Sequence, residues 1–333
     1  MDGVKVVKFF IILFTSFLIS LGLLDLMYSF RRKRFFINPL LIIWSLTVIA
    51  GFVFIYGKRL HEEYATGQID LKNAVSIYYY LNIICALVNY LWQLAKTNKI
   101  LKFYNTVPVF DCMSYFCIDH RSVKKAALLT FIKIILIPII VEINLILREL
   151  RKGEESNLLE TLYHLYPMVI ANFLPNCLFA GFVVCRECMK ALNILLKLVE
   201  NEANFYQNVK QMKLNTRFYR MQIFCDLSDK LDELSEKYNL VCFYTLEYTQ
   251  LISLPLICSL LSNLLGITAG CFQQYYAIAD TMINEETYDV FDALTNGVFL
   301  AISFSEIAIL NMVVNDCIEK VSNGEVEVHK CIV

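Results

Sequence analysis

A polar stripe lies inside an apolar segment near the C-terminal end of the chain. Asp292, Asn296, Phe299, Ser303 and Glu306 follow one another at spacings of four, three, four and three residues. At about 3.6 residues per helical turn, they fall on one helix face within an arc of about 80°. Lipid cannot cover two carboxylates in such a segment. The stripe is therefore typical of the wall of a ligand cavity or ion path, or of a buried hydrogen-bonding seam between helices.

Other polar and aromatic side chains gather toward one end of the apolar segments. Aromatic walls with a few polar groups are the usual composition of a small-molecule site. For any single tyrosine, the interfacial aromatic belt of membrane proteins is the alternative explanation. We predict an outward-opening ligand pocket formed by Glu142, Tyr163, Tyr166, Asn172, Gln273, Tyr276, Asp292 and Asn296.

Signatures of catalysis and of metal binding are absent from the sequence. It contains four histidines, and no H-E-x-x-H, G-x-S-x-G or Walker motif. Among its 12 cysteines, Cys185 and Cys188 form one C-x-x-C pair, and no second pair stands at zinc-ligand spacing. We therefore predict no enzyme activity, no metal site and no cofactor.

Long apolar runs must position the polar groups. Of the 333 residues, 57% are hydrophobic and only 18% are charged, whereas soluble proteins carry about 25% charged residues. About 20 apolar residues in a helix cross a bilayer, where the backbone must find its hydrogen bonds within the protein. The sequence predicts an all-α polytopic membrane helix bundle with six spanning helices, at 37–56, 74–94, 126–147, 162–184, 244–279 and 290–314.

The preceding apolar run, at 9–30, allows three interpretations. Lys5 and Lys8 before an apolar core, followed by Ser20 and Gly22, resemble a signal peptide. The run could instead cross the membrane, or enter it and return. Gly22 and Asp25 interrupt the run, which favours an N-terminal re-entrant or interfacial helix.

Basic residues are concentrated in every second gap between the apolar runs. The gaps at 31–34, 96–125 and 190–237, together with the C-terminal tail, hold 20 Lys and Arg residues, whereas the opposite gaps hold six. In membrane proteins the side richer in basic residues is cytoplasmic. The sequence therefore predicts a multi-pass protein with a cytoplasmic N-terminus.

We expect one membrane domain over residues 1–333. Apolar residues at helical spacing along 224–238 predict an amphipathic helix that either lies along the bundle or contacts another subunit. In the fifth span, Pro255 predicts a kink, and Gly266 with Gly270 predicts a close helix contact. The expected parts are an N-terminal segment 1–36, spans one to four at 37–184, a cytoplasmic amphipathic region 185–243, spans five and six at 244–314, and a cytoplasmic tail 315–333.

Two stretches carry a resemblance to a known family. Gly-Leu-Leu-Asp through Arg-Arg-Lys-Arg-Phe, at 22–35, leads into the first span, and Leu-Ser-Asp-Lys-Leu through Tyr, at 227–238, leads into the fifth. In these stretches, and in the order of its spans, the chain resembles the insect gustatory receptors of the insect chemoreceptor superfamily. The resemblance implies a ligand-gated cation channel subunit that detects small-molecule tastants and does not bind nucleic acid. It also implies a homo- or hetero-tetramer with other gustatory receptors, in the plasma membrane of chemosensory neurons.

The resemblance does not extend to one motif. The family carries T-Y-x-x-x-x-x-Q-F in a seventh span that lines its pore, and the sequence contains no copy of this motif. The segment 315–333 is too polar to span a bilayer. We therefore expect a receptor truncated before the pore helix, which does not conduct ions alone.

Two other classes of membrane protein are alternatives. If the run at 9–30 spans, the chain has seven helices, as in a G-protein-coupled receptor, but the D-R-Y and N-P-x-x-Y motifs are absent. A transporter predicts a repeated pair of broken helices, and the sequence shows no such symmetry.

Overall fold

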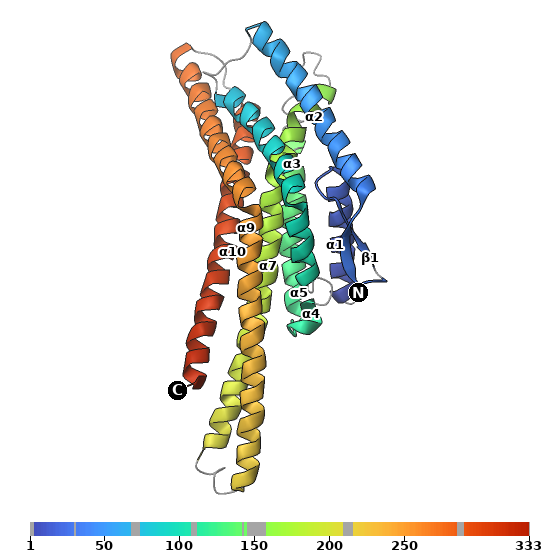
Figure 1. The fold of residues 1–333 in the computed structure, drawn as a ribbon. Coiled ribbons are helices and arrows are strands. Elements are labelled where there is room, and N and C mark those ends of the chain that lie inside the picture. Colours follow the sequence, from blue (N-terminus) through green and yellow to red (C-terminus); the bar gives the residue numbers. More distant parts are fainter. Residues whose placement is uncertain are drawn as a thin grey trace.

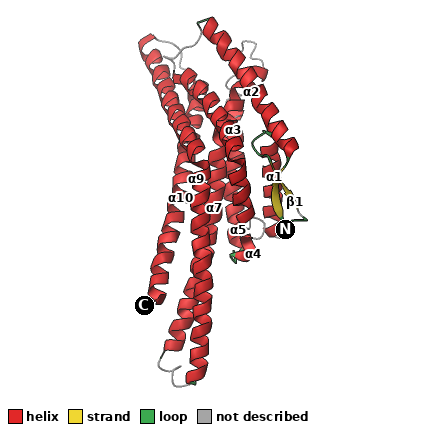
Figure 2. Cartoon of the chain, in the orientation of Figure 1, coloured by secondary structure: helices red, strands yellow, loops and turns green. Residues whose placement is uncertain are grey.

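The protein is a bundle of long helices that run up and down beside one another (Figure 1). The computed structural model describes residues 3–29, 31–67, 74–107, 112–141, 143–144, 158–208, 216–284 and 290–332. Within these residues the only strands are one short antiparallel pair beside α1 (Figure 2). The predicted fold class, an all-α polytopic membrane bundle, is confirmed.

The elements follow one another along the chain with short connections. The helices are α1 (Gly3–Ser20), α2 (Pro39–Ala65), α3 (Ala74–Thr106), α4 (Cys112–Tyr115), α5 (His120–Phe131), the π-helix η1 (Ile132–Leu136), α7 (Leu158–Gln207), α9 (Arg217–Asn284) and α10 (Val290–Ile332). Strands β1 (Leu26–Ser29) and β2 (Arg34–Ile37) separate α1 from α2. Helix α9 is continuous from its polar N-terminal part through Pro255 to its apolar C-terminal part.

Four described helices are long and apolar enough to cross a membrane. They lie at Pro39–Ala65, Leu162–Gln207, Arg217–Ile283 and Val290–Ser322. The other two predicted spans fall on α3 and on the α5–η1 segment, which continues as helix to Val141. The total of six spans stays a prediction.

The N-terminal segment enters the bundle and returns. Helix α1 is followed by a turn at Gly22, whose φ of 70° favours glycine because a side chain is strained there. Strand β1 then leads back toward the end at which α1 begins, and β2 pairs with it in antiparallel register, Leu26 opposite Ile37. Asp25 lies at the buried end of this hairpin with 2% exposure. Its carboxylate accepts hydrogen bonds from Ser45 and Thr97.

The segments rich in basic residues lie at one end of the bundle. The α3–α4 connection, the α7–α9 connection and the C-terminal part of α10 are all at the lower end in Figure 1, and the β1–β2 turn points the same way. We call this the basic end. The α2–α3, α9–α10 and α7-preceding connections lie at the opposite end. The geometry therefore matches the charge pattern of the sequence.

Prolines in the long helices explain several contacts between helices. A proline lacks an N–H, so the carbonyl four residues before it loses its helical partner. Pro255 frees the carbonyl of Leu251, which accepts a hydrogen bond from the Trp92 indole N–H of α3 at 2.7 Å. Pro167 likewise frees a carbonyl in α7. That carbonyl, of Tyr163, accepts from the Tyr56 hydroxyl of α2 at 2.7 Å.

A third proline in α7, Pro175, follows the same rule. It frees the carbonyl of Ala171, which accepts from the Asn89 amide of α3 at 3.2 Å. Asn89 also donates to the Ile170 carbonyl at 2.8 Å. Neighbouring side chains thus supply the hydrogen bonds that let proline-containing helices persist in lipid.

Glycines allow α9 to approach its neighbours closely. A Cβ at Gly266 would meet the Tyr78 ring of α3 at 2.9 Å, and one at Gly270 would meet Leu300 of α10 at 2.8 Å. The two glycines therefore face different partners. Because Gly270 has no side chain, Asn296 reaches its carbonyl and donates to it at 2.9 Å.

The arrangement predicts which exposed positions share a side of the membrane. Single cysteines replacing Lys33 and Glu202 should react with a membrane-impermeant maleimide under the same conditions, because both lie toward the basic end. A cysteine replacing Thr66, at the end of α2, should show the opposite accessibility in intact and permeabilised cells. The variants are compared in a background with Cys117, Cys225 and Cys271 replaced by serine, because these native thiols are exposed. Equal labelling of the Lys33 and Thr66 positions in intact cells would contradict the fold.

Candidate functional site

A buried ion pair joins the polar stripe to another helix. The Lys133 ammonium of η1 lies 2.5 Å from a carboxylate oxygen of Glu306 on α10. It also donates to the Asn176 side-chain oxygen of α7 at 3.3 Å. Lys133 is only 5% exposed. Three helices therefore meet at one charged contact, and the pair offers a strong donor and a strong acceptor within an apolar interior.

Local backbone geometry positions the lysine. The α5 helix passes at Ile132 into the π-helix η1, which ends at Leu136. Pro138 follows shortly after, and without an N–H it cannot continue the regular hydrogen-bond ladder. Short π-helical turns inside α-helices frequently occur at functional sites. The wider turn carries Lys133 toward α7 and α10.

A large cavity lies next to the ion pair. Its volume is about 760 Å³, within the usual range for small-molecule sites. Parts of α1, α3, α4, α5, η1, α7 and α9 form its wall, and Glu306 is its contact with α10. The lining is mainly aliphatic and aromatic. Its polar side chains include Thr130, Asn172, Asn176 and Glu187.

Of the predicted pocket residues, Asn172 lines this cavity. Its side-chain oxygen accepts a hydrogen bond from Ser259 of α9 at 3.3 Å. Glu306, from the polar stripe, also lines it. The structure thus brings one member of each predicted set to the same cavity.

Tyr163 and Tyr166 lie in an aromatic cluster between α2, α3 and α7. The Tyr163 ring stacks on Tyr56 with centroids 4.4 Å apart, and the Arg59 guanidinium lies 4.5 Å from its centroid. The Tyr166 hydroxyl is 2.8 Å from that of Tyr90. These tyrosines therefore contact one another and Arg59. They lie outside the residues that line the cavity.

The other stripe residues face protein. Asn296 is buried against Gly270 of α9, and the Phe299 ring meets the Tyr78 ring edge-on at 6.4 Å. The Ser303 hydroxyl donates to the Phe299 carbonyl of its own helix. Asp292 is partly buried in the first turn of α10. Along most of its length the stripe is a seam between helices, with Glu306 as its contact to the cavity.

The remaining predicted pocket residues lie near the end opposite the basic end, or outside the description. Gln273 is partly buried on α9, and Tyr276 is exposed there, with its ring 4.8 Å from that of Phe272. Glu142 lies outside the described residues. A ligand-binding role for each of the eight predicted residues stays a prediction.

Sequence reasoning assigned no role to Lys133, because a lysine near the membrane surface can extend its ammonium into water. The structure instead buries it against Glu306. The available signal was the combination of a lysine and an acid in two different apolar runs, since buried charges require partners. Asn176, the third member, was likewise missed.

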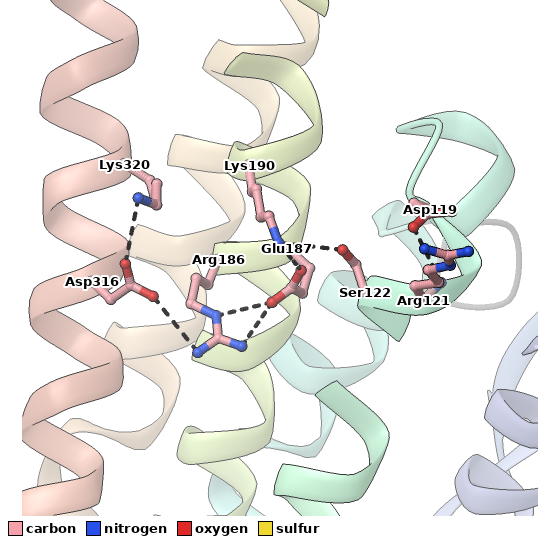
Figure 3. Close-up of polar contacts among 8 residues, drawn as sticks. All are labelled: Asp119, Arg121, Ser122, Arg186, Glu187, Lys190, Asp316 and Lys320. Atoms are coloured by element: carbon pink, nitrogen blue, oxygen red, sulfur yellow. Dashed lines mark hydrogen bonds and ion pairs between the residues drawn. The ribbon is translucent and has the colours of Figure 1, made fainter. Parts of the chain in front are cut away.

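The basic end carries a second set of ion pairs (Figure 3). Arg186 of α7 contacts Glu187 at 2.7 Å and Asp316 of α10 at 3.7 Å. Lys190, one turn further, donates to the Ser122 hydroxyl of α5 at 3.4 Å. The network joins the same three segments as the Lys133–Glu306 pair, closer to the basic end.

Comparison with known proteins identifies the family. The family model described as "7tm Chemosensory receptor" matches residues 11–325. The chain belongs to the 7tm chemosensory receptor family. Two curated relatives of Drosophila melanogaster agree: "Putative gustatory receptor 94a" is 41% identical over 313 residues, covering 93% of this chain and 77% of the relative. "Putative gustatory receptor 97a" is 38% identical over 295 residues, covering 88% and 70%.

These matches confirm the resemblance to gustatory receptors that the sequence suggested. The match covers nearly the whole of this chemosensory receptor, including the re-entrant segment from residue 11 and all of the cavity-lining helices. The family is one of receptors and not an enzyme class, which agrees with the absence of catalytic motifs.

The ion pair generates a prediction about stability. Glu306→Ala and Lys133→Ala should each lower the thermal unfolding midpoint, because either leaves a buried charge without its partner, a loss on the order of 3 kcal/mol. The double variant Lys133→Met/Glu306→Leu should recover most of the loss, because it removes both charges. Fluorescence-detected size-exclusion chromatography of heated, detergent-solubilised protein measures the midpoint.

Ser303→Ala is the matched control on the same helix face, since its hydroxyl bonds to its own helix. It should shift the midpoint by less than either charged variant. A double variant as unstable as the single ones would show that the charges do not act as a pair.

Proposed function

We propose that this chemosensory receptor is a gustatory receptor, a subunit of a ligand-gated cation channel that detects small-molecule tastants. The observation that carries the proposal is the cavity of about 760 Å³ whose wall contains the Lys133–Glu306 contact. The printed names of the two Drosophila melanogaster relatives support the gustatory assignment. We propose further that the receptor works in the plasma membrane of chemosensory neurons, with a cytoplasmic N-terminus.

The geometry supports a simple mechanism. A ligand shifts a conformational equilibrium only by binding one state better than the other. In the closed state, the cavity wall holds η1, α7 and α10 together through Lys133, Asn176 and Glu306. A ligand that hydrogen-bonds to Lys133 or Glu306 competes with this contact. It therefore favours a state in which α10 is released from η1.

The conducting assembly is proposed to be a homo- or hetero-tetramer with other gustatory receptors. Because the sequence has no T-Y-x-x-x-x-x-Q-F motif, we expect that a version carrying a complete seventh span is required for current. Transcript sequence downstream of the Val333 codon tests that expectation. The functional experiment uses both versions of the chain.

Ion currents test the receptor function. Cells expressing the version with a seventh span should respond to part of a panel of alcohols, amides, alkaloids and sugars. The double variant Lys133→Met/Glu306→Leu should reach the surface and show a raised basal current, because the closed-state contact is gone. The concentration for half-maximal response should fall by about tenfold, the effect of about 1.4 kcal/mol less closed-state stabilisation.

Asp292→Ala provides a comparison at the other end of the stripe. The stripe hypothesis expects it to alter ligand response or ion selectivity at normal surface expression. Wild-type currents from both the double variant and Asp292→Ala would refute a role of the stripe in the receptor.

A further inference from the structure

Two cysteine thiols from distant parts of the sequence lie in contact. Cys112 begins α4, and Cys188 lies on α7, 76 positions later. Their sulfur atoms are 3.5 Å apart. A thiol–thiol contact at this distance needs only a small closure to become covalent. Neither the polar stripe nor the proposed ligand contact uses these residues.

The surroundings fix both thiols and leave them accessible to small molecules. Phe116, Met189 and Val241 pack around Cys188, with Cys112 against the same cluster. Both thiols also line the basic-end part of the cavity. A small, uncharged oxidant that enters the cavity therefore meets the pair, although bulk solvent does not.

The C-x-x-C spacing does not define the reactive pair. Cys185 accepts a hydrogen bond from the Thr245 hydroxyl at 3.1 Å, so its sulfur is held toward α9. Cys188 instead contacts Cys112. The neighbours of Cys188 hold α7 in place, because Glu187 pairs with Arg186 and Lys190 bonds to Ser122 at the start of α5 (Figure 3). The structure thus selects one partner among several nearby cysteines.

We propose that Cys112 and Cys188 are a peroxide-responsive site that forms a reversible disulfide and locks the α4 segment onto α7. This inference does not depend on the proposed channel function. A disulfide in a reducing compartment is typically a transient, redox-sensing bond. The bond would close a chain loop of 75 intervening residues.

The reaction balances with hydrogen peroxide as the oxidant. The Cys112 thiolate attacks one peroxide oxygen, the O–O bond breaks, and hydroxide leaves and takes up the thiol proton as water. The sulfenic acid formed on Cys112 is then attacked by the Cys188 sulfur, which forms the S–S bond and releases a second water. Two thiols are oxidised by two electrons and one peroxide is reduced to two waters. A cellular thiol such as glutathione reverses the step by exchange.

The contact also favours Cys112 as the attacking group. The Cys188 thiol donates a hydrogen bond to the Cys112 sulfur, which lowers the pKa of Cys112 below its usual range, against the opposing effect of burial. A larger thiolate fraction at neutral pH makes a cysteine more reactive toward peroxide.

Mass spectrometry of the full chain in membranes tests the proposal. In a Cys117→Ser background, trypsin places Cys112 alone in peptide 103–121 and Cys188 alone in peptide 187–190. After hydrogen peroxide and blocking of free thiols with N-ethylmaleimide, these two peptides should appear joined. Dithiothreitol should separate them. The joined peptide should be absent from Cys112→Ser and from Cys188→Ser, and present in the matched control Cys225→Ser, whose thiol is exposed on α9.

Thermal unfolding gives an independent readout. Peroxide should raise the unfolding midpoint of the Cys117→Ser protein, because a closed loop restricts the unfolded chain, and the rise should be lost in both single serine variants. Two outcomes overturn the proposal: Cys112 and Cys188 that both remain alkylated by N-ethylmaleimide after peroxide, or a disulfide that joins peptide 187–190 to a peptide other than 103–121. The peptide measurement needs no variant of either cysteine, so it decides the question even if a serine variant fails to fold.

Discussion

The structure depends on the requirement that a helix in lipid must satisfy its backbone hydrogen bonds within the protein. Each proline in a spanning helix frees one carbonyl, and an unpaired polar group in apolar surroundings costs about 2 kcal/mol or more. In α7 and α9 the freed carbonyls of Tyr163, Ala171 and Leu251 are met by side chains of α2 and α3. The prolines therefore specify contacts: α2 and α3 are held against α7 and α9 at the points where those helices lack a bond of their own.

The same requirement governs the buried charges. Asp25 accepts from Ser45 of α2 and Thr97 of α3, which fixes the tip of the N-terminal hairpin. Lys133 is paired with Glu306 across the cavity wall. The two sites differ in what can replace the bond. Asp25 is outside the cavity lining, whereas a molecule in the cavity can exchange hydrogen bonds with the ion pair. For this reason the proposed ligand contact is placed at the pair and not at the hairpin.

The sequence was sufficient for the fold class, because apolar length and alternating basic gaps follow directly from bilayer thickness and charge. It was also sufficient to find the stripe, since its 4-3-4-3 spacing is a property of one helix. It could not pair Glu306 with Lys133, because which helices are neighbours depends on proline-directed contacts and on the π-helix at Ile132–Leu136. It also grouped Tyr163 with Asn296 by depth alone, whereas they contact different helices. Depth in the bilayer is readable from one sequence, but helix adjacency is not.

The return of the N-terminal segment explains why the ion pair and the thiol pair share a cavity. Helix α1 ends at Ser20 and the chain turns back, so Leu13, Phe17 and Leu24 form one wall beside α5 and α7. The opposite wall contains Cys188 toward the basic end and Glu306 further along. Both pairs act on one continuous segment, since α4 leads through α5 into η1 and Lys133. A bond at Cys112 therefore restrains the segment whose movement would break the ion pair, and the two contacts oppose the same displacement from its two ends.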